Sequence, residues 1–348
     1  MTLCERLAID FPLLQAPMAG VQNWQLAVAV SEAGGLGAIP CGMLAPDQIV
    51  EHIEQFRRRS QRPYNLNFFC HTMPAADNAL LQHWQQQMTP YYNQLEVEPP
   101  GFDGALRRPF DDDIADLLEP YRPAVISFHF GLPAAELLQR VKSWGTTVLS
   151  SATTLEEGLW LQQHGADVVI AQGIEAGGHR AVFLQGDDWP ALLQQQPGCA
   201  ELVTQLSRQL DIPVIAAGGI ASHADVRRML AAGAAGVQLG TSYLLCDEAN
   251  TSELHRQALQ DEQRQTAVTT LFSGRPARGI VNRVMTELGC MPSPLPPFPY
   301  ASLALAPLRS AAEARQRDDF SPLWAGENRS GCRAISAAQL TRQLWFGE

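Results

Sequence analysis

The sequence predicts a (β/α)8 barrel, an α/β TIM barrel, with an inserted helical and loop segment and a C-terminal cap or side domain. Three observations lead to this prediction. Eight short apolar runs recur along the chain, and helical patterns separate them. The runs are apolar on both faces, as parallel strands covered by helices are. Several helical stretches end at a glycine, which is a common helix C-terminus. Eight strands alternating with helices are typical of the closed barrel.

Each element can be placed on the chain. The eight predicted strands are 12–18, 36–40, 64–69, 124–129, 146–151, 167–172, 213–218 and 236–241. The intervening stretches, such as WQLAVAVSEAG and HADVRRMLAAGA, have the length and apolar spacing of helices. Two intervals, about 70–123 and 181–212, are too long for simple crossovers and are predicted insertions. We therefore expect the barrel over 1–250 and a C-terminal cap or side region over 251–348.

Composition narrows the functional classes. The 348 residues carry a formal net charge of −11, which argues against a nucleic-acid or anionic-membrane surface. The seven cysteines are scattered, with no CxxC pair, so reduced thiols in a cytoplasmic protein are expected. No apolar segment approaches the roughly 20 residues that span a bilayer. The N-terminal MTLCERLAID also lacks the pattern of a signal peptide. The oligomeric state stays open.

In such barrels the active site lies at the C-terminal ends of the strands, and here these ends carry few charges. The single lysine, Lys142, lies in a predicted helix, so a Schiff-base mechanism has no nucleophile at the rim. Only Glu175, His129 and His179 follow strands as acids, bases or ligands. A metal site needs several converging carboxylates or imidazoles, and a glycosidase needs two carboxylates. We expect neither.

Glycines dominate the ends of the last two strands. Gly218 and Gly219 follow the seventh strand, and Gly240 and Thr241 follow the eighth. Barrels commonly bind phosphate at these two loops. Bare main chain lets N–H groups approach an oxyanion, and Thr241 can donate a hydroxyl and begin a helix whose dipole favours negative charge. The alternative is that these glycines only make tight turns.

A phosphate anchor beside a pocket poor in acids and bases favours a bound cofactor that brings the chemistry. Flavin mononucleotide (FMN) fits this pattern. The amides of Asn67 and Gln172 are candidates for hydrogen bonds to the edge of the flavin ring, and Pro17 and Met18 for an apolar wall. We also expect Gln238, in the last strand, to contact the cofactor.

Six stretches follow one another along the chain: QAPMAG, AVSEAGGLG, FHFGLP, GIEAGGHR, PVIAAGGIA and GVQLGTSYLLCDEA. Together they resemble the motifs of the nitronate monooxygenases, formerly called 2-nitropropane dioxygenases, and the resemblance covers roughly residues 13–248. It implies an FMN-containing barrel that oxidises alkyl nitronates with O2 to a carbonyl compound and nitrite, without a metal. The EAGGH stretch is similar to the signature of the bacterial class.

The resemblance also implies roles for particular residues. The glycines Gly177 and Gly178 would bring bare main chain against the flavin, and His179 would stand beside its reactive face. A cationic His179 would hold an anionic nitronate, whereas a neutral one would take a proton from a nitroalkane. The resemblance places His129 in the same pocket. Glu175 would either orient a neighbour or serve only as a turn residue.

Two departures from the family pattern concern the substrate side. Ala181 stands where this class usually has a glycine, and FPYASLALAPL replaces a pattern with several tyrosines and a lysine. Tyr300 is then the one phenol expected in the substrate pocket. The histidines expected at the surface are His52, His83, His164, His223 and His255.

Two alternatives remain. A related FMN barrel reduced by NAD(P)H, such as a quinone reductase or an enoyl-thioester reductase, would share the phosphate loops. A separate dinucleotide fingerprint is missing, because AGGLGAI lacks the GxGxxG spacing, so a nicotinamide would dock over the flavin. The other alternative is a barrel without redox chemistry that binds a phosphorylated metabolite.

Overall fold

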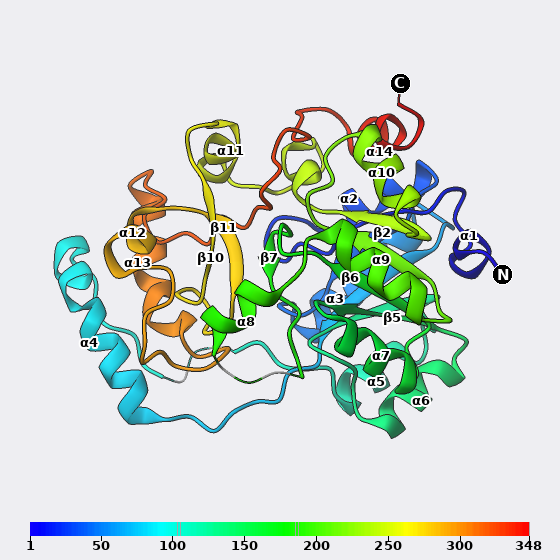
Figure 1. Ribbon diagram of the computed structural model, residues 1–348. Coiled ribbons are helices and arrows are strands. Elements are labelled where there is room, and N and C mark those ends of the chain that lie inside the picture. Colours follow the sequence, from blue (N-terminus) through cyan, green and yellow to red (C-terminus); the bar gives the residue numbers. More distant parts are fainter. Residues whose placement is uncertain (103, 105, 185, 187, 348) are drawn as a thin grey trace.

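A ring of parallel strands covered by helices forms one half of the molecule, on the right in Figure 1. The computed structural model describes residues 1–102, 104, 106–184, 186 and 188–347, and within these ranges eight strands join in the order β1-β9-β8-β6-β5-β4-β3-β2. A parallel bridge between Leu14 and Leu36 closes the ring. The predicted (β/α)8 barrel is confirmed. The strands are β1 (Leu13–Gln15), β2 (Gly37–Pro40), β3 (Tyr64–Phe69), β4 (Val125–His129), β5 (Thr147–Ala152), β6 (Val168–Gln172), β8 (Val214–Ala217) and β9 (Gly236–Leu239).

Helices surround this ring. Their apolar faces pack on strands whose residues are almost all buried, which explains the two-sided apolar runs in the sequence. The short α1 (Leu3–Leu7) contributes to the same apolar cluster as strand residues such as Leu14 and Ile170. The remaining helices of the ring are α2 (Trp24–Glu32), α3 (Pro46–Arg57), α5 (Asp112–Leu118), α6 (Ala135–Ser143), α7 (Leu155–Gln163), α9 (Cys199–Gln209), α10 (His223–Ala231) and α14 (Ala337–Phe346).

The segment 251–348, expected to form one cap, divides between two places. Its last helix, α14, packs against α2 and α10 and so fills the position of the eighth barrel helix. The phenol of Tyr243 meets Thr341 Oγ1 at 2.8 Å, and the rings of Phe11 and Trp345 stack. The cap therefore leaves the barrel after β9, and the chain returns to complete the ring of helices.

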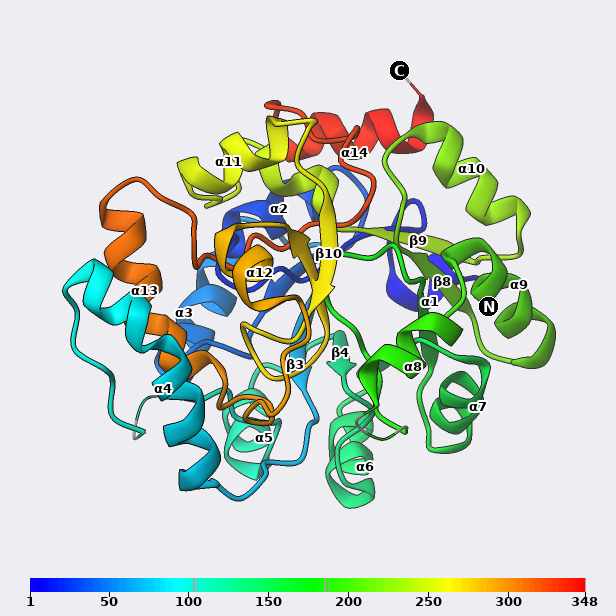
Figure 2. The same cartoon turned by 60° about the vertical axis from the view of Figure 1, so that its left-hand side comes forward.

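The cap takes in part of the first predicted insertion. Helix α4 (Asn78–Leu95) packs against α13 (Ser302–Ala314), and the two lie side by side in both views (Figures 1 and 2). Trp84 Nε1 donates to the carbonyl of Ala301 at 3.1 Å, and the Tyr92 hydroxyl donates to that of Ala304 at 2.7 Å. These contacts belong to an apolar core separate from those of the barrel. The other cap elements are α11 (Glu253–Gln260), β10 (Thr266–Thr269), β11 (Ala277–Ile280) and α12 (Arg283–Leu288).

The second predicted insertion, 181–212, is shorter than expected, because α9 packs on β6 and β8 as an ordinary barrel helix. The extra structure is α8 (Trp189–Gln195) and the two-residue strand β7 (Gly178–His179). β7 pairs antiparallel with β11 of the cap, so that His179 lies opposite Ala277 and Gly178 opposite Arg278. The cap sheet β10-β11-β7 thus holds the EAGGH stretch over the barrel.

Candidate functional site

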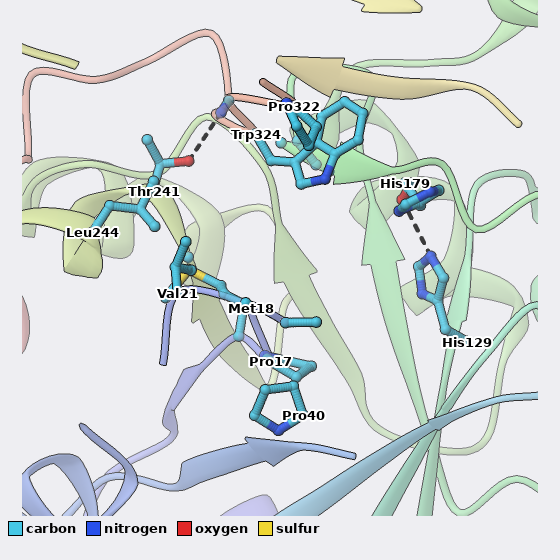
Figure 3. A pocket seen from close by; sticks show the side chains of 18 of the residues that line it. Pro17, Met18, Val21, Pro40, His129, His179, Thr241, Leu244, Pro322 and Trp324 are labelled. Carbon is cyan, nitrogen blue, oxygen red and sulfur yellow. Dashed lines mark hydrogen bonds between the residues drawn. The ribbon is translucent and has the colours of Figure 1, made fainter. Parts of the chain in front are cut away.

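A cavity of about 300 Å³ lies at the C-terminal ends of the barrel strands, under the cap. This volume is within the range of small-molecule sites. Figure 3 shows Thr241 on one side, His179 and His129 on the other, Trp324 above and Pro17 with Met18 below. The predicted site residues that line it are Pro17, Met18, Asn67, His129, Gln172, Gly177, Gly178, His179, Gly218, Gly219, Gln238, Gly240 and Thr241.

The two glycine loops present free main-chain donors to this cavity. Gly218 and Gly219 have positive φ values of 119° and 71°, a conformation that glycine adopts without strain. In the described part of the chain, the N–H groups of Gly218, Gly219, Gly240 and Thr241 donate to no protein acceptor. Since main-chain donors in folded proteins are nearly always paired, four free ones in adjacent loops indicate a site for an anion.

A segment after the cap covers these loops. The main-chain N–H of Gly326 donates to Thr241 Oγ1 at 2.9 Å, and Asn328 Nδ2 donates to the carbonyl of Gly219 at 3.2 Å. The Thr241 hydroxyl still has its own proton to donate to a ligand. As expected, Thr241 begins a helix, the short 3-10 helix η1 (Thr241–Leu245).

The carboxylate of Glu175 caps a helix. Both its oxygens accept from the main-chain N–H of Cys199, at 3.1 and 3.0 Å, at the first residue of α9. The missing side chain of Gly177 also has a packing reason, because a Cβ there would lie 2.5 Å from Gly326 N. Gly177 lines the cavity, so the prediction that its bare main chain faces the flavin stays a prediction. At Gly178 no heavy atom lies within 4 Å of such a Cβ.

His179 is fixed at its main chain and at its ring. Its carbonyl accepts from Gln172 Nε2 at 2.9 Å and from His129 Nε2 at 3.1 Å (Figure 3). Gln172 Oε1 accepts in turn from Ala181 N at 2.9 Å. The ring nitrogen Nε2 of His179 lies 2.9 Å from Ser273 Oγ. Rings surround this imidazole, with centroids 5.4 to 6.4 Å away, in Phe69, Phe130, Phe298 and Trp324.

These contacts determine which ring nitrogen carries the proton in neutral His129 and in neutral His179. A carbonyl only accepts, so His129 Nε2 carries a proton. Ser273 Oγ donates its one proton to the carbonyl of Arg275 at 3.2 Å and therefore accepts from His179 Nε2. In both rings Nδ1 is then the unprotonated nitrogen.

The histidines of this cavity are held in their neutral forms. Burial lowers the pKa of His179 well below its ordinary value, and the charge of Arg107 adds to this effect. Burial also lowers the pKa of His129 to about 4, although the carbonyl of His179 opposes the shift. His71, behind Phe298, has its pKa lowered to about 4 by burial. At neutral pH these imidazoles are uncharged.

The amides expected to meet a flavin ring are partly engaged. Asn67 Nδ2 donates to the carbonyl and to Oγ of Ser127, at 3.2 and 2.9 Å, which leaves Oδ1 for a ligand. Gln238 Oε1 is buried with no hydrogen-bond partner in the described residues, which is costly without a ligand. Gln172 keeps one free N–H beside its bond to His179.

Two predictions about side chains differ from the structure. Tyr300 does not line the cavity; its hydroxyl donates to the carbonyl of Pro74 at 3.2 Å. Residues after α12 turn back toward α4, and this places the phenol in the cap. His255, expected at the surface, is only 4% exposed and lines the cavity, because α11 packs over the loop that carries Trp324.

Sequence reasoning missed several cavity or neighbouring residues. His71 follows β3 by two positions, so the strand-end argument could have found it. The others come from the cap, from the loop after α4 or from the segment that covers the two glycine loops, and no local pattern in the sequence marks them. They are Arg107, Ser273, Trp324, Gly326 and Asn328.

The described ranges contain neither a cluster of metal ligands nor a helix that could span a membrane. Across the described ranges, no three His, Cys, Asp or Glu side chains gather closely enough to hold a metal ion. Among the helices of those ranges, none has both the length and the apolar character needed to cross a membrane.

Comparison with known proteins gives relatives that point to one family. The family profile described as nitronate monooxygenase matches residues 1–347. The "Nitronate monooxygenase" of Paraburkholderia phytofirmans is 39% identical, over 97% of this chain and 92% of that protein. The solved nitroalkane oxidase of Streptomyces ansochromogenes has a TM-score of 0.88 at 36% identity, covering 98% of this chain and 96% of that one. FabK from Thermotoga maritima shares the fold alone, with a TM-score of 0.70 at 23% identity, covering 99% and 94% of the two chains. The chain therefore belongs to the nitronate monooxygenase family.

Proposed function

We propose that this protein is an FMN-dependent nitronate monooxygenase, which oxidises alkyl nitronates with O2 to a carbonyl compound and nitrite. The observation that carries the proposal is one cavity with free main-chain donors at one side and a neutral, aromatic-enclosed imidazole at the other. Family membership supports the reaction class. The free thiols of all seven cysteines support a reducing compartment, and we propose the cytoplasm.

The residues present fit FMN along the length of the cavity. Its phosphate would accept from the N–H groups of Gly218, Gly219, Gly240 and Thr241, which have no protein acceptor within the described ranges. The unpaired Gln238 Oε1 and the free Asn67 Oδ1 would face the polar edge of the ring system. Pro17 and Met18 would form the apolar floor. When bound, FMN supplies the electron acceptor that this chain lacks.

His179 would act as the group beside the substrate. Its neutral form leaves Nδ1 unprotonated while Nε2 stays bonded to Ser273, so the ring keeps one orientation beside the substrate. His129 and Gln172 act by positioning His179, because both donate hydrogen bonds to its carbonyl. The sequence left two roles open for His179, and the lowered pKa favours the neutral role over the cationic one.

The walls around His179 would shield the reaction from water. The rings of Phe69, Phe130, Phe298 and Trp324 enclose the imidazole, with ring centres 5.4 to 6.4 Å from its own. A small anion with an apolar tail suits such a pocket, since orientation and water exclusion are what the chain must provide. O2 is small and apolar enough to enter the same space.

One experiment separates this function from the alternatives. Purified protein should be yellow and release FMN on denaturation. Mixed anaerobically with ethyl nitronate, the flavin should bleach, and in air the same mixture should yield nitrite. NAD(P)H should leave the flavin oxidised. Bleaching by NAD(P)H without nitrite formation from any nitronate would instead identify a reductase, and a colourless protein that binds no FMN would remove redox chemistry altogether.

A further inference from the structure

A nitronate is an anion, and a nearby positive charge would favour its binding, but the histidines of this cavity do not supply one. His71, His129 and His255 have pKa values lowered to about 4, and that of His179 is lowered as well, so these rings are neutral at neutral pH. The chain's single lysine, Lys142, pairs with Asp167 on the outside of the barrel. Such a charge would therefore come from an arginine.

Arg107 lies on the cavity wall, in the loop between α4 and α5. Its guanidinium carbon is 5.6 Å from the centre of the Phe298 ring, and Phe298 itself contacts His179 at 5.6 Å between ring centres. The main chain of Arg107 is also held, because its carbonyl accepts from His71 Nε2 at 3.2 Å. The positive charge is thus placed one aromatic ring away from the reactive imidazole.

Within the part of the chain that the structure describes, the Arg107 guanidinium lies over the Phe298 ring and has no hydrogen bond or ion pair to a protein acceptor. The other cation of this wall, Arg309, is engaged: its Nε donates to Glu313 at 2.7 Å. Arg275 lies over the Phe130 ring at 4.4 Å and donates to the carbonyl of Val182. A guanidinium over a ring with unused donors is well suited to bind a planar anion.

We propose that Arg107 is the residue that recognises the anionic O–N–O group of the substrate and so selects nitronates over neutral nitroalkanes. This inference rests on the proposed function. Two donors of one guanidinium match two oxygens of one planar group, as they do in arginine–carboxylate pairs. The substrate side of this chain has no lysine, and Arg107 would supply the positive charge there.

The test compares four variants of the FMN-loaded protein. R107Q and R107M remove the charge, and R107M keeps an unbranched stem against Phe298. R107K keeps the positive charge but lacks the planar pair of donors that a guanidinium presents. R309Q/E313Q is the matched control, because it removes a cation from the same wall while leaving its net charge unchanged. The readouts are kcat and KM for ethyl nitronate and the Kd for nitrate, a planar anion with the same O–N–O group, followed through the flavin spectrum.

R107Q and R107M should each raise KM and the nitrate Kd by about tenfold or more, with kcat within about twofold of the parent. R107K should recover part of the loss, and the control should stay within about twofold. Equal losses in R107K and R107M, or an unchanged nitrate Kd in R107Q, would overturn the role of Arg107. If the parent protein forms no nitrite from any nitronate, the proposed function fails instead, whatever the nitrate titration gives.

Discussion

At the scale of single residues, His179 is a partly buried imidazole whose main chain and ring are both held. His129 and Gln172 bond its carbonyl, and Ser273 accepts from its Nε2. None of these contacts uses Nδ1. The surrounding rings and the nearby charge of Arg107 keep the imidazole neutral, so Nδ1 is available as an acceptor throughout the neutral pH range.

The variant His179→Ala should keep its FMN and lose about 10²-fold in kcat/KM for ethyl nitronate, because a nitronate has no proton to give up and the ring acts by holding the substrate in place. Because the pKa of His179 lies well below 6.5, kcat/KM of the parent should be flat between pH 6 and 8 and fall only in acid. Steady-state nitrite formation measures both. His164→Ala, at an exposed ring on the barrel exterior, is the control. Undiminished kcat/KM in the His179 variant would remove this residue from the mechanism.

The residues that sequence could predict are those at strand ends. Chain order and a barrel fold place these ends at one rim, so Asn67, Gln172 and Gly218 were predictable from spacing alone. Arg107 and Ser273 were not, since they reach the cavity through long-range packing of the cap. Tyr300 was misplaced for the same reason: its neighbours depend on how α13 packs against α4.

At the scale of elements, the strands were predicted to within one to three residues, because two-sided burial gives continuous apolar runs. The three-stranded sheet of the cap was not predicted. β7 has two residues and pairs with a strand almost 100 positions away, and no periodicity can mark so short a segment. Even so, β7 is the element that sets the position of His179.

The two glycine loops are the elements that should decide cofactor binding. Gly219→Val puts a β-branched residue at a φ of 71°, which costs about 1–3 kcal/mol and displaces the main-chain donors. We expect this variant to lose most of its FMN, measured as the ratio of flavin absorbance to protein. Gly289→Val is a matched control, with a φ of 76° at an exposed position outside the cavity lining. Full FMN content in a folded Gly219→Val protein would contradict the phosphate-loop assignment.

At the scale of the whole molecule, the cap is an insertion between the eighth strand and the eighth helix of the barrel. The chain leaves the ring after β9, builds the cap with α4, and returns through residues 325–328 to α14. On that return it bonds both glycine loops, through Gly326 and Asn328. The same segment therefore ties the cap to the proposed cofactor site, and cofactor binding should also stabilise the cap.

Burial of neutral histidines across barrel and cap also predicts how the whole protein responds to acid. His71, His129 and His255 have folded-state pKa values of about 4, against 6.5 for an unperturbed imidazole. Below pH 6.5 the unfolded chain binds protons that the folded chain does not. The depressed pKa values therefore leave stability unaffected above about pH 6.5 and reduce it progressively as pH falls from 6.5 toward 4.

Each such imidazole should lower the free energy of unfolding by about 1 kcal/mol between pH 6.5 and 5.5. Urea unfolding of the FMN-loaded protein at the two pH values measures the loss. His255→Gln should reduce it by about that amount, because His255 is 4% exposed and its Nε2 has no partner among the described residues. His83→Gln, at an exposed position of α4, is the control and should leave the loss unchanged. If both variants lose as much stability as the parent, the pH dependence has another origin, and His255 is protonated or solvated in the folded protein.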